Sequence, residues 1–181
     1  MNNFMKLFAV FVLFVQIQIA LSQSNVSPPG PSLIQQLCKS NRYQTLCVST
    51  LNLDPRSKTS DIQGLASISI DATTKKVKES LDYLTSVYKK IGGGGRGDYE
   101  RYGTCMEEYG AAANRFLPAA LADLKAKKYS LAMSDMKEVV SVPGICEDQF
   151  AGYSPLPVTQ RNKAVHDIAD MTADIIKTFV K

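Results

Sequence analysis

Four cysteines are the residues in this 181-residue chain whose chemistry is most readily interpreted. A zinc site would need clustered ligands, but no Cys-x-x-Cys pair occurs and His166 is the only histidine. An even cysteine count in a secreted chain instead indicates two disulfides, with three possible pairings. We favour Cys38–Cys47 with Cys105–Cys146, because the first closes a short loop and the second joins two predicted helices. Loop-closure entropy gives these bonds stabilities of about 2.7 and about 3.9 kcal/mol.

Other residues with possible chemistry do not form a catalytic set. His166 precedes Asp167, but no motif places a serine or cysteine nucleophile near them, so we expect a histidine on a helix surface. Arg96-Gly97-Asp98 spells an adhesion tripeptide, which three common residues match easily by chance. The glycine run at 92–95 lacks the Gly-Lys-Ser/Thr ending of a phosphate-binding loop. The sequence therefore predicts a protein that is not an enzyme and needs no metal or cofactor.

Residues 1–22 predict a cleaved secretory signal peptide. Lys6 is the only charge before an apolar run at 7–21, which is shorter than the ~20 residues that cross a bilayer. Small residues stand at the first and third positions before a cut in Ala20-Leu21-Ser22. We therefore expect a secreted chain without a membrane anchor. Asn25 begins a possible glycosylation sequon, Asn-Val-Ser, which a proline follows directly.

The remaining residues, 23–181, are about one domain in length. Removing Lys6 lowers the formal net charge from +4 to +3. This mild basicity falls short of the concentrated positive patch expected in a nucleic-acid-binding protein. We therefore expect neither nucleic acid nor a membrane as a partner.

The elements that position the cysteines are helical. At residues 31–57, two short apolar pieces, Leu33–Cys38 and 43–53, flank a polar turn and predict a hairpin held by the first disulfide. From residue 60 to residue 181, four segments place apolar residues at helical period. The sequence therefore predicts an all-α fold: an up-and-down four-helix bundle with an N-terminal α-helical hairpin extension.

Several signals predict where the four long helices begin and end. Ser60 and Gln63 suggest a capping box at the start of the first, and the glycines at 92–95 end it. The second starts near Asp98, with a kink or break about one turn before Pro118. The third includes Leu131 in its apolar stripe and ends at Pro143-Gly144, and the fourth starts near Thr159.

An ordered set of short motifs runs along the chain: Cys38 and Cys47 with eight residues between them, Leu53-Asp54-Pro55-Arg56-Ser57, Asp61-Ile62-Gln63-Gly64-Leu65-Ala66, Cys105 with Tyr109, Cys146-Glu147-Asp148-Gln149-Phe150, and Asn162-Lys163-Ala164-Val165 before a last helix. Together they resemble the plant invertase inhibitor and pectin methylesterase inhibitor family. The resemblance implies a helical bundle with a hairpin and disulfides that pair the first cysteine with the second and the third with the fourth. It also implies a secreted, stoichiometric enzyme inhibitor. The expected location is the cell wall (apoplast), with the vacuole as the alternative.

The family divides by target, and the resemblance implies a different contact region for each. Invertase-directed members carry a Pro-Lys-Phe motif before the third helix, where this chain has Lys127-Lys128-Tyr129. The lysine is kept, but proline and phenylalanine are replaced. A lysine beside an aromatic ring could pair with acidic groups in a sugar-binding cleft. The alternative interpretation is a solvated run at a helix end that binds nothing.

Pectin methylesterase-directed members cover the enzyme's cleft with a face drawn largely from the second and third helices. Polar or aromatic candidates on that face are Tyr99, Glu107, Glu108, Asp123, Ser134, Asp135 and Glu138. We expect a chain that is monomeric when free and forms a one-to-one complex with pectin methylesterase (pectinesterase). The alternative target is acid invertase, a beta-fructofuranosidase of the cell wall or vacuole. A small helical lipid carrier is a further alternative, which would require an apolar tunnel.

Overall fold

The protein's structure is a computed structural model that describes residues 32–91, 96–153 and 158–180. Within these ranges every regular element is helical, and the unit Leu33–Lys181 contains all of them. The elements are α2 (Leu33–Cys38), α3 (Gln44–Leu53), the 3-10 turn η1 (Pro55–Lys58), α4 (Ile62–Ile91), α5 (Arg96–Ala111), the π-helical turn η2 (Ala112–Phe116), α6 (Leu117–Lys125), α7 (Tyr129–Asp148) and α8 (Thr159–Lys177).

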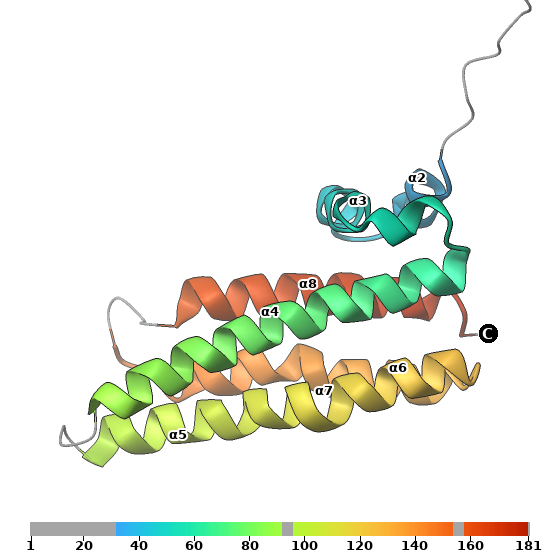
Figure 1. The fold of residues 1–181 in the computed structure, drawn as a ribbon. Helices are drawn as coiled ribbons and strands as arrows, with labels where there is room; N and C mark the ends of the chain where they lie inside the picture. The colour runs from blue at the N-terminus through green and yellow to red at the C-terminus, as the bar shows by residue number, and fades with distance from the viewer. Residues whose placement is uncertain (1–31, 92–95, 154–157, 181) are drawn as a thin grey trace, which may run out of the picture. The chain divides into compact units, whose positions relative to one another are not determined.

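The predicted fold class is confirmed. The bundle consists of α4, the continuous α5–η2–α6 rod, α7 and α8, and the α2–α3 hairpin packs against α4 and α8 (Figure 1). The predicted signal peptide and Asn25 lie outside the described residues, so they stay predictions. None of the helices in the described ranges is long and apolar enough to cross a bilayer.

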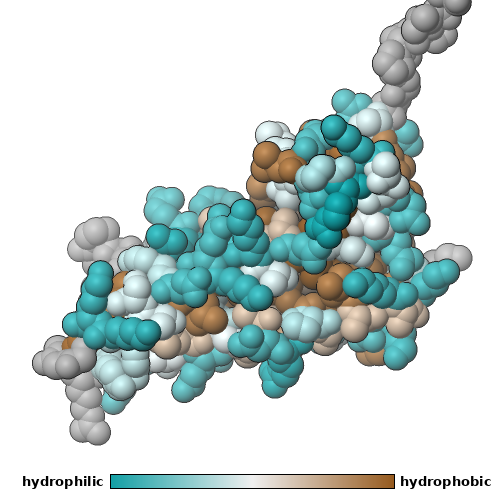
Figure 2. Space-filling model, in the orientation of Figure 1, coloured by the Kyte–Doolittle hydropathy of each residue, from teal (hydrophilic) through white to brown (hydrophobic). Residues whose placement is uncertain are grey.

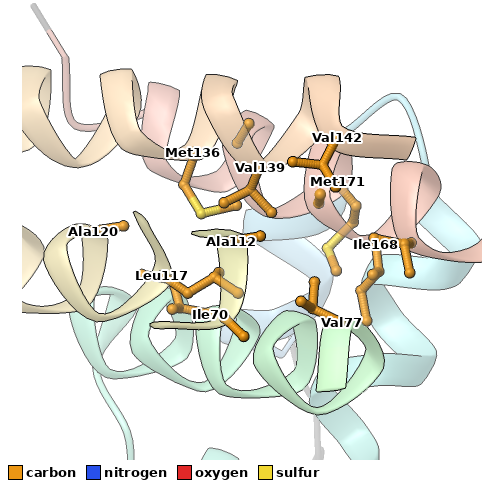
Figure 3. Packing of buried hydrophobic residues seen from close by; sticks show 14 of the residues in the cluster. Ile70, Val77, Ala112, Leu117, Ala120, Met136, Val139, Val142, Ile168 and Met171 are labelled. Carbon is orange, nitrogen blue, oxygen red and sulfur yellow. The ribbon is translucent and has the colours of Figure 1, made fainter. Parts of the chain in front are cut away.

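The core lies along the centre of the four rods. Side chains from all of them converge in Figure 3, including Val77 of α4, Leu117 of α6, Met136 of α7 and Met171 of α8, each almost fully buried. Removing a side chain of this size from a core typically costs about 2–5 kcal/mol. Burial of the apolar residues that recur at helical period therefore supplies most of the energy that holds the rods together.

Both favoured disulfides are present and buried. Cys38 and Cys47 join α2 to α3, with their Cα atoms 5.7 Å apart. Cys105 and Cys146 join α5 to α7 with a Cα separation of 4.8 Å. The second bond therefore cross-links two rods of the bundle.

The predicted irregularity before Pro118 is also confirmed. Pro118 has no N–H group, and the turn before it widens to a π-helix in which the N–H of Leu117 donates to the oxygen of Ala112. The rod continues as α6 beyond this point. Proline therefore reshapes the helix without ending it.

The predicted stop at Pro143-Gly144 is wrong, because α7 continues to Asp148. A proline inside a helix costs about 3 kcal/mol through a lost hydrogen bond and a steric clash. Here Val142, Pro143 and Cys146 are all buried, and Cys146 is held by its disulfide. Packing of the last turns offsets the local cost.

Three predicted helix starts also differ in detail. Asp61, and not Ser60, caps α4, since its carboxylate accepts from the N–H of Gly64 at 2.7 Å. The hydroxyl of Thr159 donates to Glu147, and no side-chain cap forms at the start of α8. Asp98 lies in the first turn of α5, which begins two residues earlier. A contact with α7 thus takes up the hydroxyl of Thr159, whereas Ser60 donates locally to the carbonyl of Arg56.

The hairpin is held to α8 through its turn. The side chain of Asn41 donates to the carbonyl of Met171 at 2.9 Å. Arg42 donates to Asp174 from its backbone N–H and its guanidinium, and also reaches Asp170 at 2.7 Å. These contacts fix the hairpin against the C-terminal half of α8.

Candidate functional site

The α6–α7 junction is a turn with a fixed backbone. Lys127 has a φ of 60°, in the left-handed region that residues with a side chain seldom adopt. Its N–H donates to the carbonyl of Leu124 at 3.0 Å, and the N–H of Lys128 donates to that of Asp123 at 2.8 Å. This pair of bonds is the Schellman arrangement that closes many helices, usually with glycine at the left-handed position.

The three side chains of the junction have different environments. Lys127 and Lys128 are exposed, and the ammonium of Lys128 lies 3.8 Å from the carboxylate of Asp123. Tyr129 is half-buried, stacks on Phe179 with ring centroids 5.0 Å apart, and directs its hydroxyl to Gln63 at 3.4 Å. The lysines are available for binding, while the tyrosine ring has a structural role.

This geometry differs from what a Pro-Lys-Phe motif would require. Proline fixes φ near −65° and has no N–H group. The position of Lys127 needs a positive φ and uses its N–H in a hydrogen bond. Proline cannot occupy this turn as it stands, so the replacement of proline changes the backbone of the junction. The two Schellman hydrogen bonds hold the turn in this conformation.

Five of the seven candidates for the other contact region fall into two groups. Tyr99 is exposed on α5, and its ring lies tilted against that of Tyr88 of α4, with centroids 4.2 Å apart. A hydrogen bond with Tyr99 raises the pKa of Tyr88 to about 12, and the negative charge of Glu107 contributes in the same direction. Tyr99 and Glu107 therefore belong to the surface where α4 and α5 meet.

Asp123, Asp135 and Glu138 form the second group, on α6 and α7. Partial burial raises the pKa of Asp135, the negative charges of Asp123 and Glu138 raise it further, and Arg115 opposes them. The four groups therefore interact, and Asp135 binds a proton more readily than an isolated aspartate. The result is an acidic surface on α6 and α7 that becomes less negative in acid.

The last two candidates have less distinctive surroundings. Glu108 is half-buried on α5, and Ser134 is exposed on α7. The seven predicted residues thus do not form one continuous cluster. Sequence reasoning also missed Arg115, which faces Asp135, and Phe179, which supports Tyr129. Their sequence positions carry no signal of these contacts, which form between separate segments of the chain.

Leu131 corrects another prediction. Its place in the apolar stripe of the third helix predicted burial, but its side chain is 53% exposed. It lies in the first turn of α7, where it lines a surface groove with the junction lysines and Phe179. At a helix end the neighbouring rods no longer cover every apolar position.

The described residues give no support for a metal site or a lipid tunnel. No group of three or more potential metal ligands occurs within those residues. A groove of about 510 Å³ lies between the hairpin and α4, with apolar residues such as Leu46 and Ile68 and charged residues such as Arg56 and Lys75 in its lining. This mixed lining differs from the continuous apolar tunnel that a lipid carrier would need.

The amino-acid sequence of the bundle matches one protein family and several named relatives. The sequence profile described as plant invertase/pectin methylesterase inhibitor matches residues 32–175. A pectinesterase inhibitor of Actinidia deliciosa is 29% identical, over 94% of this chain and 90% of its own. A cell wall / vacuolar inhibitor of fructosidase 2 of Arabidopsis thaliana is 25% identical, over 95% of this chain and 97% of its own.

The fold has counterparts among solved structures. A crystal structure of a mutant form of a pectin methylesterase inhibitor from Arabidopsis superposes with a TM-score of 0.65 at 19% identity. The match covers 80% of this chain and 95% of that chain. At this level of identity the likeness establishes the shared helical fold.

Proposed function

Because the chain belongs to the plant invertase/pectin methylesterase inhibitor family, we propose that it is a secreted protein inhibitor of pectin methylesterase. The family and the named relatives are inhibitors, which supports a non-enzymatic role for this chain. The relatives include inhibitors of both pectinesterase and fructosidase, so the choice of target depends on the surface of this chain.

The observation that favours pectin methylesterase is the backbone of the α6–α7 junction. The left-handed φ of Lys127 and the hydrogen bond from its N–H are both incompatible with proline. Tyr129 is committed to Phe179 and Gln63. The junction therefore lacks the proline geometry of the invertase-directed motif, and its aromatic ring is packed against Phe179.

The proposed mechanism is occlusion. A face of α5, α6 and α7 would cover the cleft of the enzyme in a one-to-one complex and exclude its polymeric substrate. Within that face we assign contacts to the exposed ring of Tyr99 and to the acidic surface of Asp123, Asp135 and Glu138. The Cys105–Cys146 bond supports this role, because cross-linked rods lose little conformational entropy on binding.

Acid invertase is the second candidate, and one observation favours it. Lys128 keeps the lysine of the invertase-directed motif and is exposed at the tip of the junction. It could pair with a carboxylate of a sugar-binding cleft at the cost of its weak contact with Asp123. Secretion to the cell wall space suits either target, and the vacuole is the alternative location for an invertase inhibitor.

The test is to add the chain from residue 23 to residue 181 to purified pectin methylesterase and, in parallel, to purified acid invertase at mildly acidic pH. We expect saturable inhibition of the methylesterase at micromolar or lower inhibitor concentration. Lys128→Ala separates the candidates, since it should spare methylesterase inhibition and weaken any inhibition of invertase. Inhibition of invertase alone would reverse our choice of target.

A further inference from the structure

Two tyrosines face each other at the end of the bundle where α4 ends and α5 begins (Figure 1). The ring centroids of Tyr88 and Tyr99 lie 4.2 Å apart, with the ring planes tilted by 30°. A hydrogen bond also joins the two phenol groups. Every other ring–ring contact in the described residues pairs a tyrosine with a phenylalanine. This pair is therefore the place in the described chain where two tyrosine rings are in contact.

The two rings are held differently. Tyr88 is half-buried, and its Cε2 atom lies 3.7 Å from the point where a Cβ on Gly103 of α5 would stand. Since Tyr99 and Gly103 are one helical turn apart, Tyr88 lies along the side of α5 that carries Tyr99. Tyr99 is 46% exposed, so it is open to a soluble oxidant and can turn toward its partner. The hydrogen bond already brings the hydroxyls together, and with them the Cε atoms that flank each hydroxyl.

The surroundings of the pair are polar. Lys89 follows Tyr88 in the sequence, and Asp98 and Glu100 flank Tyr99. On the face shown in Figure 2, polar residues likewise predominate, and apolar ones lie in small separate areas. Polar surroundings keep the pair accessible to a water-soluble oxidant, since partners usually cover large apolar patches.

Tyrosine is the side chain that one-electron oxidants attack most readily in this protein. The chain contains no tryptophan, and all four of its cysteines are held in disulfides. A phenol loses an electron and a proton to give a phenoxyl radical, whose unpaired electron is shared between Oη and the two Cε carbons. Disulfides are typical of chains in oxidising surroundings, where the tyrosines would meet such oxidants.

We propose that Tyr88 and Tyr99 form a dityrosine cross-link when the protein meets hydrogen peroxide and a haem peroxidase. Each phenol gives up one hydrogen atom, and the two radicals couple to form a carbon–carbon bond between a Cε atom of each ring. The hydrogen on each coupled carbon then moves to the phenol oxygen of its own ring, which restores both aromatic rings. The peroxide takes up the two hydrogen atoms lost from the phenols and is reduced to two molecules of water. The new bond joins the end of α4 covalently to α5.

Tyr153 provides a matched control. It is 41% exposed, close to the value for Tyr99, so a soluble oxidant reaches both residues alike. Its ring packs on Phe150, and its hydroxyl donates to Asp98 at 2.7 Å. No tyrosine ring contacts it within the described residues. Exposure alone therefore predicts coupling at either residue, whereas the geometry of the pair predicts coupling of Tyr99 to Tyr88.

The test treats the protein with hydrogen peroxide and a haem peroxidase at low protein concentration and isolates the monomer by size exclusion. Trypsin, which cuts after lysine and arginine, then releases residues 79–89 and residues 97–101 as separate peptides. The first contains Tyr83 and Tyr88, and the second contains Tyr99 as its one tyrosine. We expect mass spectrometry to find the two peptides joined, with the sum of their masses less two hydrogen atoms. Fragmentation should place the bond at Tyr88.

Three variants complete the test. Tyr88→Phe and Tyr99→Phe keep the rings but remove the phenols, so each should abolish the joined peptides, while thermal melting checks that the bundle is intact. Tyr153→Phe should leave their yield unchanged.

Three results would overturn the proposal. The first is coupling of Tyr99 to Tyr83 as abundant as coupling to Tyr88. The second is cross-links that occur only between molecules, and the third is loss of the joined peptides in Tyr153→Phe. The readout is a covalent bond and not enzyme inhibition, so the proposal does not depend on the proposed function.

Discussion

The left-handed turn at Lys127 allows the sharpest test of the structure. A side chain in this conformation costs about 1–2 kcal/mol, which glycine avoids. Glycine also gains about 0.5–1 kcal/mol of entropy in the unfolded chain, which opposes folding. Lys127→Gly should therefore stabilise the bundle by about 0.5–1 kcal/mol. In a domain of this size, that change raises the melting temperature by about 1–4 °C.

Lys127→Pro should act in the opposite direction. The turn needs a φ of 60°, while proline is fixed near −65°, about 125° away. The substitution also removes the N–H that donates to Leu124. With the adjacent bond from Lys128 to Asp123 disturbed, we expect a loss of about 3 kcal/mol or more.

The assay is urea unfolding of wild type, Lys127→Gly, Lys127→Pro and Lys127→Ala, followed by circular dichroism. Lys127→Ala removes the charge but keeps the strain, so it controls for the loss of the ammonium group. The expected order of stability is glycine, then lysine and alanine together, then proline. A proline variant as stable as the wild type, or a glycine variant less stable than alanine, would show that the turn does not have this geometry.

Three further predictions concern the bundle. Cys105→Ser should cost about 3.9 kcal/mol and Cys38→Ser about 2.7 kcal/mol in urea unfolding, because the first bond closes the longer loop; the reverse order would contradict the entropic account. Contact with its arginine partner in the hairpin lowers the pKa of Asp174, although burial opposes it. The stability that this ionised carboxylate contributes is therefore complete above its pKa in the unfolded chain, about 3.9, and is lost as pH falls through its lower pKa in the folded protein. Asp174→Asn should therefore destabilise the protein at neutral pH and match the stability of the wild type in strong acid. The hydroxyls of Thr73 and Thr172 lie 2.9 Å apart in the buried contact of α4 with α8, so Thr172→Val should cost about 1–3 kcal/mol in thermal unfolding, and an unchanged melting temperature would refute a role for the pair.

The acidic surface of α6 and α7 connects the fold to the conditions of the proposed complex. Asp135 holds its proton to higher pH than an isolated aspartate, because it is partly buried near two carboxylates. The surface therefore loses negative charge at a higher pH than one built from isolated aspartates would. A contact made through this surface should change as Asp135 is protonated, which titration of the complex can measure.

The sequence by itself determined the features that depend on local order along the chain. Apolar residues at helical period specify the rods, since a helix with one apolar stripe must bury it. Pro118 lacks an N–H wherever it stands, so an irregularity one turn earlier followed from its position alone. The disulfide pairing could also be predicted, because loop length and helix placement favoured one of the three possible pairings, which the structure contains.

Tertiary structure decided the features that depend on neighbours from distant parts of the chain. Pro143 stays inside α7 because buried packing and the Cys146 disulfide offset its local cost. Leu131 fits an apolar stripe but remains exposed at the helix end, in the same turn of α7 whose Ala132 is fully buried. Lys127 adopts a conformation that its residue type disfavours, because the end of α6 and the start of α7 must meet there. These three outcomes depend on the tertiary surroundings of each residue, whose energies of a few kcal/mol exceed its local conformational preference. Sequence patterns record only the local preferences.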